Sequence, residues 1–193
     1  MIRVFILSGL LALCANSASA ADMRSMEVDY VEGRYSLESV VWFDAGVDEM
    51  FDVFSDWDLA SKFSSAVVEA RNLEPDAQGR PEFYIRNRGC ILFFCKSIVR
   101  QGYVESRDKS FLQAITDASR SDFLFCEESW EFSTDNGGTR VRYTLVMEPD
   151  FWVPPAIGPY MIKRKLSSDG SDALNRIEAI AQDYGSSQVT NSD

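Results

Sequence analysis

The chain has 193 residues and a formal net charge of −11, and 46% of its residues are hydrophobic, which suits a single globular domain with a sizeable core. So acidic a chain repels phosphates, which excludes nonspecific binding to nucleic acid. The sequence contains no histidine, which excludes Ser-His-Asp and Cys-His catalysis and histidine-based zinc sites. We therefore expect neither a metal nor a cofactor.

The first twenty residues have the pattern of a cleaved secretory signal peptide. Arg3 supplies positive charge, Val4 to Leu13 is a short apolar run, and Ala18-Ser19-Ala20 provides a small-x-small cleavage site. The run is too short for a permanent membrane anchor. We expect residues 1–20 to be removed and the mature chain, whose net charge is −12 after the loss of Arg3, to be exported to a bacterial periplasm. A lipidated Cys14 is the alternative, although the residue before it is not small.

The N-terminal part of the mature chain predicts one strand and two short helices. Residues 21–34 are polar and predict a frayed lead-in, whereas Tyr35 to Phe43 alternates and predicts the first strand. Ser55-Asp56 is a plausible N-cap for a second short helix over Trp57 to Phe63. The helix between them has an apolar face at the spacing i, i+3, i+4, i+7: Val47, Met50, Phe51 and Phe54.

Period-two alternation then predicts six more strands. Turn residues separate them, and the short connections favour antiparallel hairpins. The strands are predicted over Ala66 to Leu73, Glu82 to Arg88, Lys96 to Glu105, Ser110 to Thr116, Phe123 to Phe132 and Thr139 to Glu148.

A long final helix is predicted to begin at Pro159, which is tolerated in a first helical turn. Gly185 is its predicted stop, and the polar tail Ser186 to Asp193 is predicted to be disordered. The apolar stripe of the helix is Ile162, Leu166, Gly170, Ala173, Ile177, Ile180 and Tyr184.

This order of elements predicts an α+β helix-grip domain over residues 35–185. The final helix is the one element long enough to cover a curved antiparallel sheet of seven strands, so the sheet should wrap around it. The stretch VWFDAGVDEMFDVFSDWDLASKFSSAVVEARNLE (Val41 to Glu74) resembles the opening of START-like, polyketide-cyclase-type proteins of the SRPBCC superfamily. The stretches GCILFFCKSIVRQ and FWVPPAIGPYMIKRKL resemble an exported bacterial branch of it. By this resemblance, the nearest described relatives are the coenzyme-Q-binding START-like proteins and the ribosome-association-toxin group.

The resemblance implies a ligand cavity between the sheet and the final helix. Strand parity places Cys126, Glu128, Trp130 and Phe132 on one face, and Val141, Tyr143, Leu145 and Met147 on one face of the next strand. Periodicity alone makes these residues simply core. With the resemblance, the predicted lining of the cavity is Glu128, Trp130, Tyr143, Leu145 and Met147.

Glu128 is the polar member of this inward set. A carboxylate that faces a cavity needs a partner or takes up a proton, so Glu128 is a candidate for a ligand contact or an acid–base group. The alternative is that it lies at the exposed end of its strand and is solvated.

A proline-rich stretch joins the last strand to the last helix and is predicted to form the mouth of the cavity. Rigid turns would hold its aromatic residues at low entropic cost, beside a Lys163-Arg164-Lys165 run that can meet an anionic lipid surface. The alternative is a packed proline-rich corner. The residues predicted to flank the entrance are Phe151, Trp152, Ile157, Tyr160 and Met161.

The sequence GCILFFCK predicts a hairpin tip over Gly89 to Lys96. Its apolar residues Ile91 to Phe94 are predicted to touch a membrane or to form part of the cavity wall. A hairpin tip can bring flanking cysteines together, so we predict a Cys90–Cys95 disulfide and a free Cys126.

The leading functional hypothesis is a monomeric, non-catalytic periplasmic protein that binds or carries a hydrophobic small molecule, such as a lipid or a quinone-like compound, with transient contact at a membrane surface. The first alternative is an enzyme of the cyclase or dehydratase type, for which Glu128, Tyr143 and Tyr160 are the available proton-transfer groups. The second is a protein–protein interaction module whose contact patch is Ile91 to Phe94 with the proline-rich corner.

Overall fold

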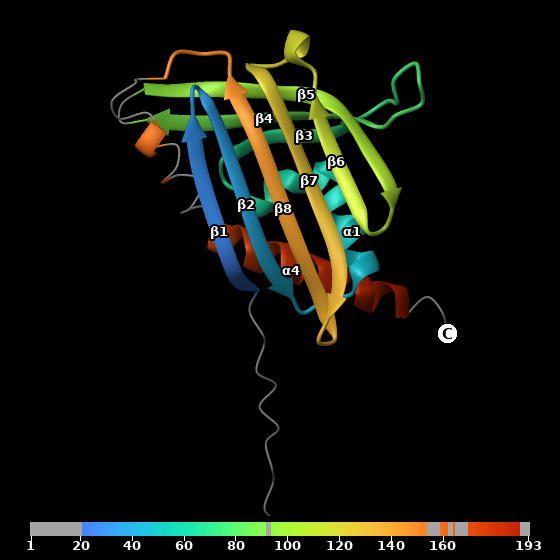
Figure 1. Cartoon of the computed structure of the whole chain (residues 1–193). Coiled ribbons are helices and arrows are strands. Elements are labelled where there is room, and N and C mark those ends of the chain that lie inside the picture. Colours follow the sequence, from blue (N-terminus) through green and yellow to red (C-terminus); the bar gives the residue numbers. More distant parts are fainter. Residues whose placement is uncertain (1–20, 92–93, 154–158, 162–163, 165–169, 190–193) are drawn as a thin grey trace, which may run out of the picture.

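Eight antiparallel strands form one curved sheet, with its longest helices on the concave side (Figure 1). The computed structural model describes residues 21–91, 94–153, 159–161, 164 and 170–189; the predicted signal peptide and Ile157 lie outside these ranges. The strands are β1 (Asp22–Val31), β2 (Arg34–Phe43), β3 (Val67–Leu73), β4 (Glu82–Ile91), β5 (Phe94–Asp108), β6 (Phe111–Thr116), β7 (Phe123–Asp135) and β8 (Gly138–Pro149). The helical elements are α1 (Val47–Ser55), η1 (Trp57–Leu59), α2 (Ala60–Phe63), η2 (Ala118–Arg120) and α4 (Gly170–Val189).

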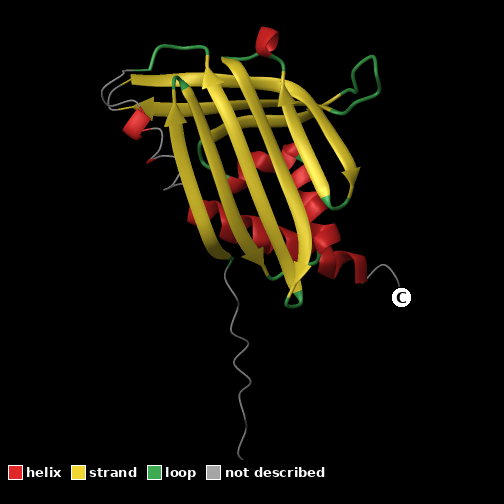
Figure 2. Cartoon of the chain, in the orientation of Figure 1, coloured by secondary structure: helices red, strands yellow, loops and turns green. Residues whose placement is uncertain are grey.

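The strand order is β1-β2-β8-β7-β6-β5-β4-β3. After β2 the chain crosses through α1, η1 and α2 to the far edge of the sheet. From β3 it then returns as a meander whose last strand, β8, pairs with β2. This α+β arrangement confirms the helix-grip prediction, and Figure 2 shows α1, α2 and α4 gathered on one side of the strands, while η2 lies at an end of the sheet.

The sheet has one strand more than the seven predicted, because residues 22–31 form the edge strand β1. They pair with β2 through a tight hairpin whose turn residues, Glu32 and Gly33, both have positive φ. The prediction of a frayed lead-in was wrong for a physical reason. An edge strand is held largely by backbone hydrogen bonds and needs few apolar residues, and Glu-Gly is a weaker hairpin signal than Asn-Gly.

The helix α4 packs against α1 and α2 and ends later than predicted. Gly185 lies inside it, where a Cβ atom would make an ordinary van der Waals contact with the Glu49 side chain of α1 at 3.5 Å, so the glycine neither ends the helix nor is required by its packing. Ser186 to Val189 are therefore helical and not part of a disordered tail, while residues 190–193 lie outside the described ranges. Residues 159–161 are helical, but residues 162–163 and 165–169 lie outside the described ranges, so one continuous helix from Pro159 stays a prediction. Across the described helices, no segment combines the length and hydrophobicity needed to cross a membrane.

The main core fills the space between the helices and the sheet. Trp57 stacks on Phe83 with 4.3 Å between ring centroids, and Phe54 contacts both Trp130 and Phe132. From α4, Leu174, Ile177, Ile180 and Ala181 join this cluster. Beneath the described part of α4, aromatic side chains are thus packed together.

Two polar side chains of α4 clamp it to the loop after β2. The backbone N–H of Asp44 donates to Oε2 of Glu178 at 2.8 Å, and Nε2 of Gln182 donates to the Asp44 carbonyl at 2.8 Å. Glu178 is buried, and burial raises the pKa of its carboxyl group above the ordinary value. These bonds fix the helix at one end of the concave face.

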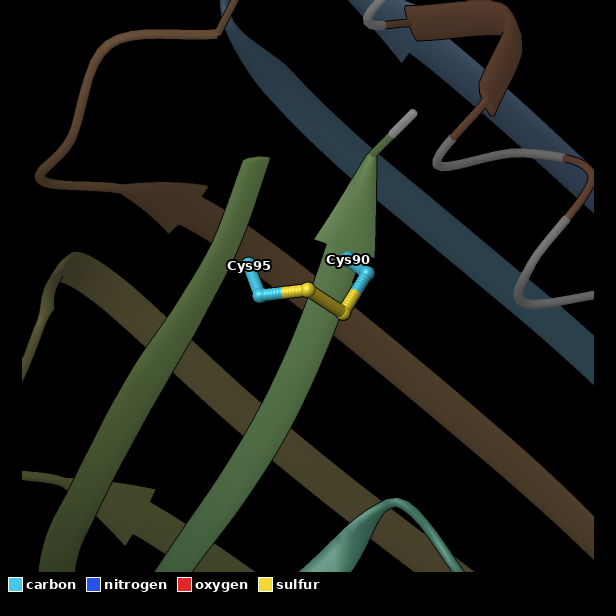
Figure 3. The surroundings of a disulfide bond; sticks show 2 residues. All are labelled: Cys90 and Cys95. Carbon is cyan, nitrogen blue, oxygen red and sulfur yellow. A yellow bond between two sulfur atoms is a disulfide. The ribbon is translucent and has the colours of Figure 1, made fainter. Parts of the chain in front are cut away.

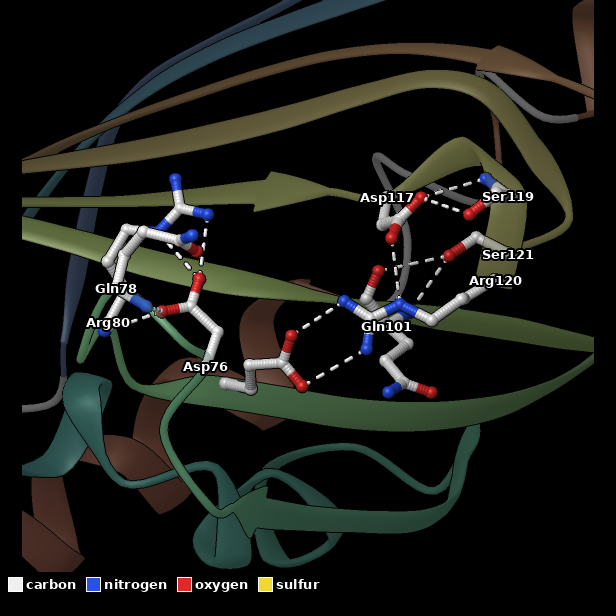
Figure 4. A network of polar contacts seen from close by, with 9 residues as sticks. Asp76, Gln78, Arg80, Gln101, Asp117, Ser119, Arg120 and Ser121 are labelled. Atoms are coloured by element: carbon white, nitrogen blue, oxygen red, sulfur yellow. Dashed lines mark hydrogen bonds and ion pairs between the residues drawn. The ribbon is translucent and has the colours of Figure 1, made fainter.

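A surface network ties the η2 connection to the neighbouring strands (Figure 4). Arg120 donates to both carboxylate oxygens of Glu82, at 3.1 and 2.6 Å, and to Asp117 at 2.8 Å. A second contact joins the Asp76 carboxylate to the Arg80 side chain at 2.7 Å. Both networks stabilise turns, and neither contains a residue of the predicted site.

Candidate functional site

The concave face has a second apolar region that only strands form, which we call the strand cluster. It lies along the strands beyond the main core, and among described residues no helix contributes to it. Its buried members are Val28, Leu37, Phe123, Cys126 and Leu145; its partly buried members are Met26, Ile98, Tyr143 and Met147. The concave face therefore carries apolar side chains that are only partly covered.

A polar triad of Arg100, Glu128 and Tyr143 lies within this apolar region. Nη1 and Nη2 of Arg100 donate to the two carboxylate oxygens of Glu128 at 2.9 and 2.8 Å, and the Tyr143 hydroxyl donates to Oε1 at 2.8 Å. The Arg100 and Glu128 side chains are only 9% and 8% exposed. This is a bidentate, charge-assisted pair in a largely desolvated place.

The sheet register explains how Arg100 reaches its partner. Glu128 pairs with Ala114 on β6, and Ala114 pairs with Val104 on β5, four residues beyond Arg100. The Arg100 side chain must therefore run along β5, past Gly102. At Gly102 a side chain would collide with the backbone of Ile115 and Thr116, so the glycine allows β6 to approach β5 closely.

The surroundings of the triad raise the pKa values of Tyr143 and Arg100, so both side chains stay protonated at neutral pH. Burial and the nearby Glu128 charge raise the pKa of Tyr143 well above 10, so its hydroxyl remains a donor at neutral pH. Burial alone would lower the pKa of Arg100, but the negative charge of Glu128 and its hydrogen bonds to the guanidinium outweigh burial and raise that pKa. Burial also raises the pKa of the Cys126 thiol, which stays neutral.

One donor of the triad has no partner among the described residues. The Nε–H of Arg100 is buried and makes no hydrogen bond there, although the other guanidinium nitrogens bind Glu128. A buried, unpaired charged donor is costly, so an acceptor on another molecule that reached it after the covering side chains moved would be stabilised.

The structure brings five predicted lining residues onto the concave face. Trp130 belongs to the main core and stacks on Tyr143, with 5.3 Å between ring centroids, at the border of the strand cluster. Leu145 and Met147 belong to the strand cluster itself. Together with Glu128, these side chains form one continuous surface, as strand parity predicted.

Glu128 was the ambiguous member, and the expectation that it is solvated at a strand end is wrong. It lies within β7, and its carboxylate is buried. The hydrogen bonds from its two partners offset the cost of this burial. Sequence reasoning missed the more important partner, Arg100. A signal was present, since Arg100 shares its parity with Ile98 and Val104 on β5, and a cation and an anion at inward positions of one sheet indicate a buried pair.

Some of the predicted mouth residues are packed against the sheet, and others are exposed to solvent. Phe151 contacts Phe123 edge-on at 6.3 Å, and the Lys96 ammonium lies 4.4 Å from its ring centroid. Trp152 is 77% and Tyr160 is 65% exposed, whereas Met161 is partly buried. Ile157 lies outside the described residues. Phe151 thus connects this segment to the strand cluster.

The predicted Cys90–Cys95 disulfide is present and Cys126 is free and buried, as predicted (Figure 3). Cys90 and Cys95 face each other directly across the β4–β5 hairpin, with Cα atoms 3.9 Å apart. The bond closes the hairpin next to its tip. The side chains of residues 91–94 are outside the described part, so their role in a contact patch stays a prediction.

Neither the surface hollows nor the acidic side chains indicate a competing site. A surface hollow of about 400 Å³ between Arg80, Val104 and Phe111 contains no predicted site residue. In the ranges that the structure describes, no three histidine, cysteine or acidic side chains are grouped to hold a metal ion.

Comparison with known protein families shows to which family this chain belongs. Residues 43–167 match the family model described as polyketide cyclase / dehydrase and lipid transport. The chain belongs to this family. No protein with a curated description matches it.

Solved structures share the fold of this polyketide cyclase and lipid transport family member at low sequence identity. The protein TTHA0849 from Thermus thermophilus is 15% identical with a TM-score of 0.60, over 77% of this chain and 98% of that protein. A STAR-related lipid transfer protein from Xanthomonas axonopodis is 13% identical with a TM-score of 0.60, over 85% of this chain and 99% of that one. The di-domain ARO/CYC StfQ from the steffimycin biosynthetic pathway is 10% identical with a TM-score of 0.59, over 79% of this chain and 52% of StfQ.

Proposed function

We propose that the protein binds and carries a hydrophobic small molecule, a lipid or a quinone-like compound, in the bacterial periplasm. The observation that carries this proposal is the polar triad set in a partly covered apolar surface to which no described helix contributes. The apolar part of a ligand would cover Met26, Ile98 and Met147. The family match and the likeness to a STAR-related lipid transfer protein support the same class of ligand.

The triad would receive the polar end of the ligand. Arg100 and Glu128 neutralise each other, so the site favours an uncharged group over a carboxylate or an ammonium. The unpaired Nε–H of Arg100 is a donor, so the matching group is an acceptor such as a carbonyl or ether oxygen. A quinone or an ester lipid carries such an oxygen at one end of a long apolar chain.

Binding is tested with the full mature chain and named probes. Native mass spectrometry and thermal-shift assays would use decylubiquinone, dioleoylglycerol and palmitic acid. We expect a one-to-one complex with decylubiquinone or with dioleoylglycerol, both of which have an uncharged polar end, and weaker binding of palmitate. Purified protein that takes up none of the three would overturn the proposal.

A matched pair of variants locates the site on the concave face. Met147 is partly buried in the strand cluster, whereas Thr144 is on the same strand with opposite parity, on the other face. Met147→Lys should abolish binding because it places a charge in the apolar surface, and Thr144→Lys should leave it unchanged. Equal effects of the two substitutions would place the ligand elsewhere. Osmotic-shock fractionation of the native host tests the periplasmic location.

A cyclase- or dehydratase-type enzyme is the second candidate. The Tyr143 hydroxyl lies 2.8 Å from the Glu128 carboxylate inside an apolar surface, which is an arrangement suited to proton transfer. The bidentate contact of Glu128 with Arg100 weighs against it, because it holds the carboxylate as an acceptor. Tyr160, the third group predicted for such chemistry, is largely exposed. A Glu128→Gln variant that binds a ligand but no longer converts it would favour the enzyme.

A further inference from the structure

One end of the sheet gathers most of the exposed apolar side chains. The described residues include eight large hydrophobic side chains that are at least 36% exposed, and six of these lie at, or follow directly from, the end where β1 turns into β2 and β7 begins. We call these six the end patch: Tyr30, Val31, Leu124, Phe125, Trp152 and Tyr160. Figure 1 shows that residues 151–153 and 159–161, which carry the last two, lie at this same end, and Phe151 contacts Lys96 near the start of β5. Apolar patches of this kind mark interaction sites.

The end patch wraps around the end of the sheet instead of lying on one face. Tyr30 shares the concave side with Tyr35, with 4.7 Å between ring centroids. Phe125 lies on the convex side, where the Arg34 guanidinium is 5.0 Å from its ring centroid. On that side, Val31, Arg34 and Val146 border a hollow of about 380 Å³. The β-bulge between Phe123 and Phe125 allows Phe123 to point into the strand cluster while both residues after it stay exposed.

The shape and composition of the patch decide its occupant. A two-fold dimer interface needs a self-complementary surface on one side of the molecule, whereas this patch covers both faces of one tip. Tryptophan and tyrosine prefer the boundary between lipid and water, because their rings are apolar and their N–H and O–H groups remain hydrated.

Cations stand at the same tip of an acidic chain. Arg34 and Lys96 contact aromatic rings there, and Arg164 is exposed shortly after Tyr160. Arg34 also forms an ion pair with Glu148, and Lys96 forms one with Asp122, so these cations do not make the tip strongly basic.

We propose that the end patch docks the protein onto the surface of a lipid bilayer, with the tip of the sheet at headgroup level. Docking is peripheral and reversible, because the contact consists of a few side chains. It does not depend on the identity of the bound ligand, but it places the strand cluster, which Phe151 and Phe123 join to this tip, beside the source of an apolar cargo.

The experiment measures partition of the mature protein into vesicles. Vesicles of phosphatidylcholine alone, and of phosphatidylcholine and phosphatidylglycerol in equal parts, are sedimented with the protein, and tryptophan emission is recorded with brominated phosphatidylcholine as the quencher. Trp152 is the one exposed tryptophan among the described residues, so we expect a blue shift and quenching that Trp152→Phe reduces strongly. We expect binding to both vesicle types without a strong preference for phosphatidylglycerol, because Arg34 and Lys96 are paired with acidic side chains.

Variants with matched exposure test the residues. Leu124→Ser and Phe125→Ser should each weaken partition by about tenfold, because each removes one large apolar side chain from the contact. Val68→Ser is the control, since Val68 is 50% exposed on β3 at the opposite edge of the sheet, and it should change nothing. Ligand binding, measured as above, should be unchanged in all of these variants.

Three results would overturn the proposal. The first is equal partition of the patch variants and the Val68 control. The second is binding to phosphatidylglycerol vesicles only, abolished by salt and indifferent to Leu124→Ser and Phe125→Ser, which would indicate simple charge attraction. The third is a concentration-dependent dimer in analytical ultracentrifugation that these two substitutions abolish, which would make a second copy the occupant.

Discussion

The buried pair of Arg100 and Glu128 can be removed in two ways with opposite expected results. In the single variant Glu128→Leu, the guanidinium of Arg100 stays in the apolar surface without the two bonds of 2.9 and 2.8 Å that now satisfy it. In the double variant Arg100→Met/Glu128→Leu, both charges are replaced by apolar side chains of similar length.

The magnitude follows from burial. With side chains 9% and 8% exposed, water cannot replace the lost partner, so the single variant should lose about 3–5 kcal/mol in the free energy of unfolding. For a chain of this size that corresponds to a fall in Tm on the order of 10 °C. The double variant leaves no unpaired charge, so it should lie within about 1 kcal/mol of the wild type or above it. It should also fold and yet lose selectivity for ligands with an acceptor oxygen.

Urea unfolding at neutral pH measures these differences. The control is Glu38→Gln, since Glu38 pairs with Arg142 at 3.2 Å on the outer face of β2 and β8, where both side chains are more than half exposed. It should cost less than about 1 kcal/mol. If Glu128→Leu costs no more than this control, or if the double variant is as unstable as the single one, then the pair is not desolvated as the structure indicates.

Three further predictions concern other parts of the chain. Burial raises the pKa of Glu178 in the folded state, so protonation of Glu178 stabilises the folded protein. This stabilisation is complete below the pKa of Glu178 in the unfolded chain and is lost as the pH rises through its pKa in the folded protein. The Tm of Glu178→Gln should therefore rise relative to that of the wild type as the pH increases from about 4 to about 7. A Tm difference that stays constant over that range would contradict this prediction. Reduction of the Cys90–Cys95 bond should lower the free energy of unfolding by at most about 2 kcal/mol, because the bond closes a short loop. Unfolding of a Cys90→Ser/Cys95→Ser variant should be insensitive to reductant, and a reductant effect on that variant would show that another group responds. Sequencing of the exported protein should find its first residue near Ala21, and a retained N-terminus would refute cleavage.

Much of the site was predictable, because the period of a strand determines which side chains share a face. Parity alone placed Trp130, Tyr143 and Leu145 with Glu128, and the structure keeps them together. The disulfide was also predictable, since a hairpin tip over Gly89 to Lys96 can bring Cys90 and Cys95 together, and the structure pairs them.

Two features escaped because they depend on neighbours that are distant in sequence. β1 is an edge strand whose hydrogen bonds are made to β2, and its own residues are too polar to indicate it. Arg100 and Glu128 lie 28 residues apart, and their contact requires the register of β5, β6 and β7.

By itself, the sequence determined the class of fold, most of the strands, the inward and outward faces and the cysteine pairing, because each follows from local periodicity and turn chemistry. Only the tertiary structure decided that Glu128 is paired and buried, and that side chains from β1, β7 and the segment after β8 meet at one tip. The physical reason is that burial and proximity are properties of the packed sheet, in which distant segments exclude water from one another.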